Sequence, residues 1–489
     1  MSEQQVDYSR KWYVMAAVGT GIFLSTIDGS IVNVALPYLE SAFNTEFAVV
    51  QWVVLAYLLV VATLVLGVGR LADMIGKKPL YTAGFVIFTF GSILAGLSPT
   101  IYWLIGFRVV QALGAVMLFA LGMGIVTEAF PPSERGRALG VTGAMVSVGI
   151  VVGPTLGGLL IELYSWRLIF YVNLPVGIAG TLLAWRYLPN IKPPGGQRFD
   201  FAGALALFVS LLCFSLALTV GQDLGFADPL IMTLFALFVL FLALFLLIEW
   251  RSDQPMIDLR LFNSTLFNVG LSTGFMTFMA ISATTILMPF YLENVLGYKA
   301  IQIGLLMATT PIVLGIVAPI SGSLSDRFGT RPITIIGLVT LAIGYLALST
   351  LGVDTSAAGF VLRFLPIGIG MGIFQSPNNS AIMGTAPRWR LGIVSGMLAA
   401  TRSLGQTTGI ALLGAVWASR VFSFVGETLP GGATTAPGLA QVNGLHDTFR
   451  FIAAIIIIAL ILAIWAFVQE RRSSITEPLS EHSEDILSP

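Results

Sequence analysis

Two charged segments of similar sequence interrupt an otherwise apolar chain: GRLADMIGKKP at residues 69–79 and GSLSDRFGTRP at residues 322–332. They are 253 residues apart, and ALPYLE at 35–40 returns as MPFYLE at 288–293 with the same offset. A third pair surrounds Arg108 and Arg363, and its offset differs by only two residues. This agreement predicts that the chain contains two copies of one structural unit.

The composition indicates a protein whose solvent is lipid. Hydrophobic residues make up 56% of the chain and charged residues 10%, whereas soluble proteins average about 25% charged residues. The net charge is zero and no basic block is present, which argues against nucleic acid as a partner. One cysteine, Cys213, and two histidines give no disulfide framework, metal site or catalytic triad. We therefore expect no metal, no cofactor and no enzymatic activity.

Fourteen segments are apolar enough to cross a bilayer, for which about 20 residues are needed. They are residues 12–36, 48–71, 78–98, 101–127, 137–162, 167–188, 201–221, 229–250, 264–293, 301–325, 331–350, 357–384, 391–420 and 447–470. The pair at 201–250 lies between the two copies of the repeat. The sequence thus predicts an all-α integral membrane protein with 14 transmembrane helices, arranged as two pseudo-symmetric six-helix bundles plus a two-helix insertion.

The same pattern predicts the domain boundaries and the orientation. We expect an N-terminal bundle at 1–188, a linker and inserted helix pair at 189–263, a C-terminal bundle at 264–470 and a flexible cytoplasmic tail at 471–489. With the N-terminus inside, about 18 of the 25 Lys and Arg residues fall on cytoplasmic segments, as the positive-inside rule requires. Both termini are therefore expected to be cytoplasmic in a multi-pass protein of the cell membrane. We expect a flexible outer loop at 421–446.

Asp28 is the most informative single residue, because it is an acid well inside the first predicted span. Such a charge costs about 2.5–3.5 kcal/mol on insertion scales and marks a functional site by default. Arg108 lies at a similar depth in the fourth span, so the two side chains are expected to meet. Burial disfavours a charged carboxyl group and a nearby cation favours it, so a changing Asp28–Arg108 distance would release or capture a proton. The alternative is a fixed pair that only holds helices together. The repeat places Ala280 or Ile281 at the position equivalent to Asp28, so the second half has no matching acid.

Six motifs follow one another along the chain. They are LSTIDGSIVNVALP with Asp28, Asn33 and Pro37; the loop with Gly69, Asp73, Gly76, Lys77 and Lys78; Arg108, Gln111 and Gly114; Gly149, Gly153, Pro154, Gly157 and Gly158; WRLIFYVNLPVG at 166–177; and RSLGQTTG at 402–409. On these motifs the chain resembles, over nearly its whole length, the major facilitator superfamily, and specifically its 14-helix drug:proton antiporter branch of the multidrug efflux type. One departure is Ala112, where that family usually has a glycine, and its methyl group affects close helix packing.

The resemblance implies roles for two of these motifs. The loop at 69–79 and its copy, which contains Asp326, Arg327, Gly329 and Arg331, are expected to latch the two halves through Asp73 and Asp326, although a cytoplasmic location explains part of their charge. The motif at 149–158 is typical of antiporters. Its four-residue glycine spacing permits close helix approach, and Pro154 removes one helix hydrogen bond, so this helix is expected to pack tightly and to hinge.

The cargo is expected to bind between the two halves at mid-membrane. Amide, aromatic and charged side chains within apolar spans suit amphiphilic molecules. The candidates are Asn33, Trp52, Tyr57, Gln111, Gln375, Asn378, Asn379 and Arg402. Each aromatic residue has packing as its alternative role, and Arg402 has pairing with backbone carbonyls or polar neighbours.

The sequence therefore favours a secondary active transporter that exports drug-like or lipophilic small molecules in exchange for protons by alternating access. The alternative is a lipid or lipophilic-metabolite exporter, and a nutrient symporter or a non-transporting sensor is less favoured. The expected partners are the lipid bilayer, a small amphiphilic substrate and protons, with no nucleic acid and with the protein as a monomer.

Overall fold

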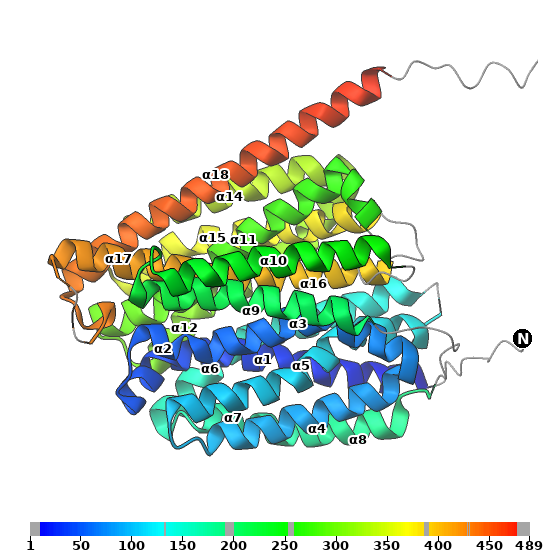
Figure 1. The fold of residues 1–489 in the computed structure, drawn as a ribbon, viewed down its shortest axis with the longest axis horizontal. Coiled ribbons are helices and arrows are strands. Elements are labelled where there is room, and N and C mark those ends of the chain that lie inside the picture. Colours follow the sequence, from blue (N-terminus) through cyan, green and yellow to red (C-terminus); the bar gives the residue numbers. More distant parts are fainter. Residues whose placement is uncertain are drawn as a thin grey trace, which may run out of the picture.

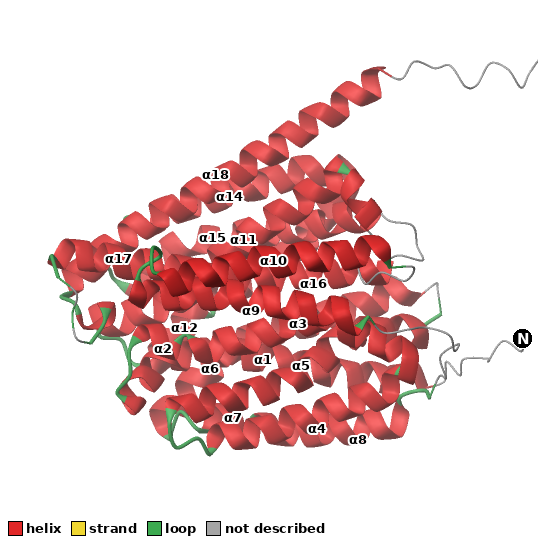
Figure 2. Ribbon diagram, in the orientation of Figure 1, coloured by secondary structure: helices red, strands yellow, loops and turns green. Residues whose placement is uncertain are grey.

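The computed structural model describes residues 10–131, 134–190, 200–252, 259–385, 391–427, 429 and 431–476. In these ranges the chain folds into helices joined by short loops, without a β-strand (Figure 2). The long helices run roughly side by side, and the N-terminus and the end of the last helix lie on the same side of the molecule (Figure 1). We call the opposite end of the bundle the far end.

Eighteen α-helices are found in the described residues. The first eight are α1 (Lys11–Phe43), α2 (Phe47–Val50), α3 (Trp52–Ile75), α4 (Lys77–Gly96), α5 (Ile101–Ala129), α6 (Arg135–Leu163), α7 (Leu168–Tyr171) and α8 (Asn173–Tyr187). The inserted pair consists of α9 (Phe201–Leu224) and α10 (Pro229–Arg251). The last eight are α11 (Thr265–Phe290), α12 (Ala300–Met307), α13 (Thr309–Phe328), α14 (Thr330–Leu348), α15 (Ala357–Gly384), α16 (Leu391–Thr408), α17 (Gly414–Val425) and α18 (Gly438–Thr476).

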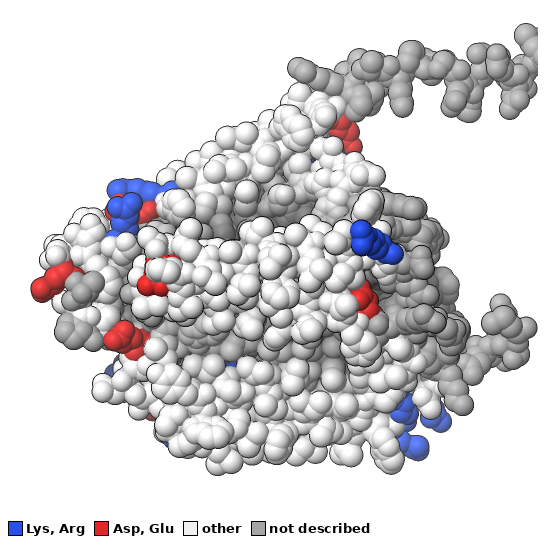
Figure 3. Space-filling view, viewed as in Figure 1, with Lys and Arg blue, Asp and Glu red and all other residues white. Residues whose placement is uncertain are grey.

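These helices form 14 segments long and apolar enough to span a membrane within the described part of the chain, which confirms the predicted helix count. Short helices join longer ones within single spans, as α12 joins α13. On the face seen in Figure 3, charged side chains gather towards the two ends and leave a mostly uncharged band between them. Such a band is what contact with lipid chains requires.

Several predicted helix ends were wrong: α17 ends at Val425 rather than at 420, and α18 ends at Thr476 rather than at 470. The first helix continues past residue 36 to Phe43, because Pro37 is accommodated inside it, and Asn44 ends it with a left-handed φ of 47°. The last helix begins at Gly438 rather than at 447, so part of the expected 421–446 loop is helical. Turn-forming glycine and proline residues predict a loop there, but packing against α17 stabilises the helix, where Trp417 Nε1 donates to the Gln441 carbonyl at 3.3 Å.

The two charged segments form the same turn in the two halves. Gly76 separates α3 from α4 with a φ of 97°, and Gly329 separates α13 from α14 with a φ of 87°. Positive φ values of this kind favour glycine, because it has no side chain to collide with the backbone. The sequence repeat therefore corresponds to a repeat of structure.

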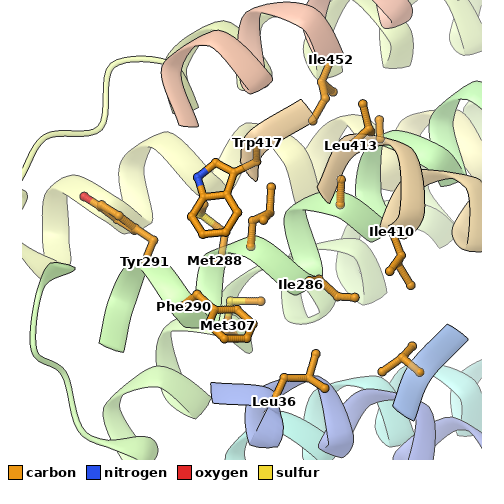
Figure 4. Packing of buried hydrophobic residues seen from close by; sticks show 14 of the residues in the cluster. Leu36, Ile286, Met288, Phe290, Tyr291, Met307, Ile410, Leu413, Trp417 and Ile452 are labelled. Carbon is orange, nitrogen blue, oxygen red and sulfur yellow. The ribbon is translucent and has the colours of Figure 1, made fainter. Parts of the chain in front are cut away.

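The largest apolar core joins the two halves at the far end. Phe47 of α2 contacts the rings of Phe290 and Trp417 edge-on, with centroids 5.0 Å and 5.3 Å apart. Leu36 of α1 belongs to the same buried cluster, and Figure 4 shows it below Ile286 of α11. The inserted helices α9 and α10 pack against each other, and α9 packs on α3. The predicted domain boundaries remain a prediction.

Candidate functional site

The carboxylate of Asp28 lies at the centre of a polar network in the N-terminal half. Arg108 Nη1 donates to Asp28 Oδ2 at 2.6 Å. Gln111 Nε2 donates to the other oxygen, Oδ1, at 2.8 Å, and Asn173 Nδ2 donates to it at 2.9 Å. The exposed fraction is zero for Asp28, Gln111 and Asn173 and 1% for Arg108. The predicted meeting of Asp28 and Arg108 is therefore found, in a site sealed from solvent.

Arg108 is held in place from several sides. Its Nε donates to the Val53 carbonyl of α3 at 3.0 Å, and its Nη1 also donates to Gln111 Oε1 at 2.6 Å. The ring of Tyr57 lies 4.3 Å from the guanidinium carbon, a distance at which a cation is attracted to an aromatic face. Tyr57 and Gln111, which were expected to line a cargo cavity, are thus parts of the Asp28 network.

Two members of the network were not predicted from the sequence. Asn173 is the first residue of α8, and Ser92 Oγ of α4 accepts from Gln111 Nε2 at 2.7 Å and from Asn173 Nδ2 at 3.3 Å. Asn173 belongs to the quoted motif WRLIFYVNLPVG, and a polar residue in that apolar stretch was the available signal. Neither residue carries a charge, and a neutral polar side chain can find a partner on many helices. The sequence therefore did not specify which helix each of them would face.

The donors around Asp28 converge on both of its carboxylate oxygens, as charge-assisted hydrogen bonds do. The network can therefore hold a negative charge away from water.

The glycine motif at 149–158 places α6 between the two halves. A Cβ atom on Gly153 would lie 1.9 Å from Ser30 Oγ of α1, and one on Gly158 would lie 2.3 Å from the carbonyl oxygen of Ala300 in α12. A Cβ on Gly304 of α12 would lie 2.3 Å from the Pro154 carbonyl oxygen. Gly149 and Gly157 approach α1 in the same way. The predicted tight packing is found, and it extends across the interface between the halves.

Polar contacts also tie the halves together at the far end. Lys299 Nζ lies 3.7 Å from Glu162 Oε1, and the Ile301 amide donates to Glu162 Oε2 at 3.4 Å. Thr434 donates to Glu40 Oε1 at 2.6 Å. Together with the apolar core, these contacts close the far end in this structure.

The two loops at the other end are described only in part. Lys77 Nζ forms an ion pair with Glu128 at the end of α5, and Arg331 Nε lies 2.6 Å from Glu470 Oε2 of α18. Arg327 is exposed, and Gly69 has open space around the position of a Cβ. The side chains of Asp73 and Asp326 lie outside the described residues, so their role as latches stays a prediction.

The remaining cargo candidates divide into two groups. Asn378 is buried and donates to the Gly270 carbonyl at 3.2 Å, Asn33 donates to the Gly29 carbonyl at 2.9 Å, and Trp52 packs against the main apolar core. The second group consists of half-buried residues whose side chains form no hydrogen bond within the described part of the chain. They are Gln375, Asn379 and Arg402. No cluster of metal-ligating residues occurs in the described ranges.

Comparison with known proteins agrees with this architecture. The chain matches the sequence profile of the Major Facilitator Superfamily over residues 18–410 and again over 273–488. It is 37% identical to the riboflavin transporter RibZ of Clostridioides difficile over 84% of this chain and 89% of that protein. It is 35% identical to the multidrug resistance protein Stp of Mycobacterium tuberculosis over 83% of this chain and 75% of that protein. Its fold is similar to the crystal structure of a bacterial homolog of the human lysosomal transporter Spinster, with a TM-score of 0.66 and 19% identity over 94% of this chain and 97% of that one.

Proposed function

The chain belongs to the major facilitator superfamily of membrane transporters, and from this premise we propose that it exports small amphiphilic molecules in exchange for protons. The observation that carries the proposal is the buried Asp28–Arg108 pair. Its two residues lie in two segments, each long and apolar enough to span a membrane. A charged pair at this position is costly to insert, and intramembrane acids of this kind serve as proton relays in transporters.

The proposed cycle couples the pair to movement of the two halves. With the far end closed, Asp28 is ionised and bound to Arg108. When the halves move apart at the far end, α1 and α6 move together because their glycine contacts are tight, and Asp28 separates from Arg108. Loss of the cation favours proton uptake by Asp28 from outside. Return to the present state restores the pair and releases the proton to the cytoplasm.

The cargo class is supported by the nature of the interior and by the names of similar proteins. Relatives at 35% and 37% identity are named for multidrug resistance and for riboflavin transport. Aromatic and amide side chains between apolar helices suit molecules with an apolar ring system and a few polar groups. A lipid or lipophilic-metabolite cargo remains the second candidate, because it satisfies the same chemistry.

The test is transport by the purified protein in liposomes with an imposed pH gradient, using ethidium, riboflavin, dansylglycine and a fluorescent phosphatidylcholine as cargoes. We expect at least one small cargo to accumulate on the acidic side and nigericin, which collapses the gradient, to abolish that accumulation. Asp354→Asn removes an exposed loop carboxylate and should behave as wild type. Movement of the lipid alone would favour a lipid or lipophilic-metabolite cargo. Accumulation that is unchanged by nigericin would contradict proton coupling.

A further inference from the structure

Arg402 is a cation within the membrane-spanning region that has no counter-ion among the described residues. No hydrogen bond or ion pair from its guanidinium is found in that part of the chain. Its one interaction there is with the Phe278 ring of α11, whose centroid lies 5.1 Å from the guanidinium carbon. Arg108, by contrast, has a carboxylate, an amide oxygen and a backbone carbonyl as acceptors.

Arg402 faces the interior between the two halves. On one side of α16, Gly405 packs against the Phe275 backbone of α11. On the other side, Ala399 packs on the buried cluster of the N-terminal half, and Leu404 packs on the cluster shared by α3 and α9. Arg402 lies between these two contact faces on the side of α16 opposite Leu404, by the 3.6-residue periodicity of the helix. The residue as a whole is half-buried.

Two other polar side chains without hydrogen bonds among the described residues lie on α16 itself and on α15, which contacts α16. Gln406, one turn after Arg402, is half-buried, and no hydrogen bond to its side chain is found among the described residues. In α15, Gln375 lies between Asn378, which contacts α11, and Gly372, which contacts α13, so it too is directed between those helices.

The N-terminal half contributes open space rather than an acid. Gly29 follows Asp28 in α1, and a Cβ atom added to it would have no neighbour within 4 Å. The Asp28 carboxylate itself is fully buried and is already bound by Arg108. Among the described residues, Arg402 thus offers a guanidinium and Gln375 and Gln406 offer amides, whereas the Asp28 carboxylate is already paired with Arg108.

We infer that the cargo of this transporter carries an acidic group, a carboxylate or a phosphate, that pairs with Arg402. This inference rests on the proposed transport function and specifies its substrate class. A guanidinium binds carboxylate and phosphate oxygens through two parallel hydrogen bonds, and these bonds are strong where water is excluded. Phe278 and the apolar walls hold the remainder of the molecule, and Gln375 and Gln406 supply donors for its other polar atoms.

The inference is tested by equilibrium binding to the full-length protein in phosphatidylcholine nanodiscs. Three fluorescent probes share one ring system and differ in charge: dansylglycine is anionic, dansylamide is neutral and dansylcadaverine is cationic. We expect dansylglycine to bind about tenfold tighter than the other two, as one charge-assisted contact predicts. Arg402→Gln should remove this preference, and Arg402→Lys should keep most of it. Arg420→Gln, which removes an exposed arginine of α17, is the matched control and should change nothing.

The outcomes are separable. Equal binding of the three probes, tighter binding of the cation, no binding at all, or a preference that survives Arg402→Gln would each overturn the inference. Phosphatidylglycerol in the nanodiscs that competes with dansylglycine would identify an acidic lipid as a source of the anion, and lack of competition would identify a free small molecule. Because no pH gradient is used, failure of proton coupling would leave this result intact.

Discussion

Polar residues of three helices meet around Asp28 of α1, and each of them forms at least one hydrogen bond inside the protein. Arg108 and Gln111 come from α5, Ser92 from α4 and Asn173 from α8. A polar network in a dry region is stabilising only while its members remain paired, since an unpaired buried group loses its hydration without compensation.

Asn173→Ala tests this dependence. Removing the amide leaves Asp28 with one donor fewer, and the expected loss is about 1–3 kcal/mol of stability. The measurement is the apparent Tm of the purified protein in detergent, together with transport under a pH gradient, and both should fall. Asn294→Ala removes an exposed amide and should leave both unchanged. An unaltered Tm for Asn173→Ala would show that the amide is dispensable.

Tyr57 offers a matched pair of substitutions. Tyr57→Phe keeps the aromatic face over Arg108 and should transport as wild type. Tyr57→Leu loses the cation–π attraction, which is worth about 0.5–2 kcal/mol, so the transport rate under a pH gradient and the Tm should both fall. Equal behaviour of the two variants would mean that the ring contributes only its volume.

At the scale of residues, the sequence was sufficient to predict the contact between the two charged side chains, but not the contacts of the neutral polar ones. The contact between Asp28 and Arg108 could be predicted because opposite charges at similar depth in the membrane pair with each other, which lowers the cost of burying them. Ser92 and Asn173 could not, because a serine or asparagine finds a partner in many places and the sequence does not say which helices are neighbours. The position of Tyr57 over Arg108 could not be predicted for the same reason, and its role in binding cargo stays a prediction.

At the scale of helices, α6 is the element that connects the two bundles. Its glycines contact α1 on one face, and Gly158 contacts the start of α12 on the other. Since Gly158 contacts backbone atoms of Ala300, the structure has no room for a side chain at that position.

Gly158→Ala should therefore weaken closure of the far end. The new methyl group would lie 2.3 Å from the Ala300 carbonyl oxygen, so α6 and α12 must separate. Gly106→Ala is the matched control, because a Cβ there has no neighbour within 4 Å. The measurement is labelling of Leu36→Cys by an impermeant maleimide from the outer side, in a Cys213→Ala background. Labelling should rise in Gly158→Ala and not in Gly106→Ala; equal labelling would show that α6 does not control this end.

The two repeated turns give a second prediction at the scale of elements. Gly76→Ala and Gly329→Ala each place a Cβ at a positive φ combined with an extended ψ, a region that essentially only glycine adopts, at a cost of roughly 1–3 kcal/mol. Both should lower the Tm by similar amounts, while Gly69→Ala, inside α3, should not. A loss in only one of the two variants would show that the turns are not energetically equivalent.

Helix existence was predictable, and helix ends were less so. A run of about 20 apolar residues in lipid can satisfy its backbone only as a helix, so the spans follow from composition. The ends of α1 and α18 depend on packing beyond the apolar run, and composition does not report that packing.

For the whole molecule, the two halves are alike in fold and unlike in chemistry. Asp28 has Ala280 or Ile281 at its repeat position, and Ala280 is fully buried in the apolar core. The N-terminal half thus holds the paired acid, and the C-terminal half holds Arg402 without a counter-ion among the described residues. In the proposed cycle, the first half binds the proton and the second half binds the cargo.

The central claim is that Asp28 couples transport to protons, and Asp28→Asn tests it most directly. The asparagine keeps the size of the side chain and one of its two acceptor oxygens, but it cannot exchange a proton. The measurement compares, in the same liposomes, exchange of cargo without a gradient and accumulation of cargo driven by a pH gradient. The account predicts that Asp28→Asn retains exchange and loses the driven accumulation. Driven accumulation at the wild-type level in Asp28→Asn would contradict it.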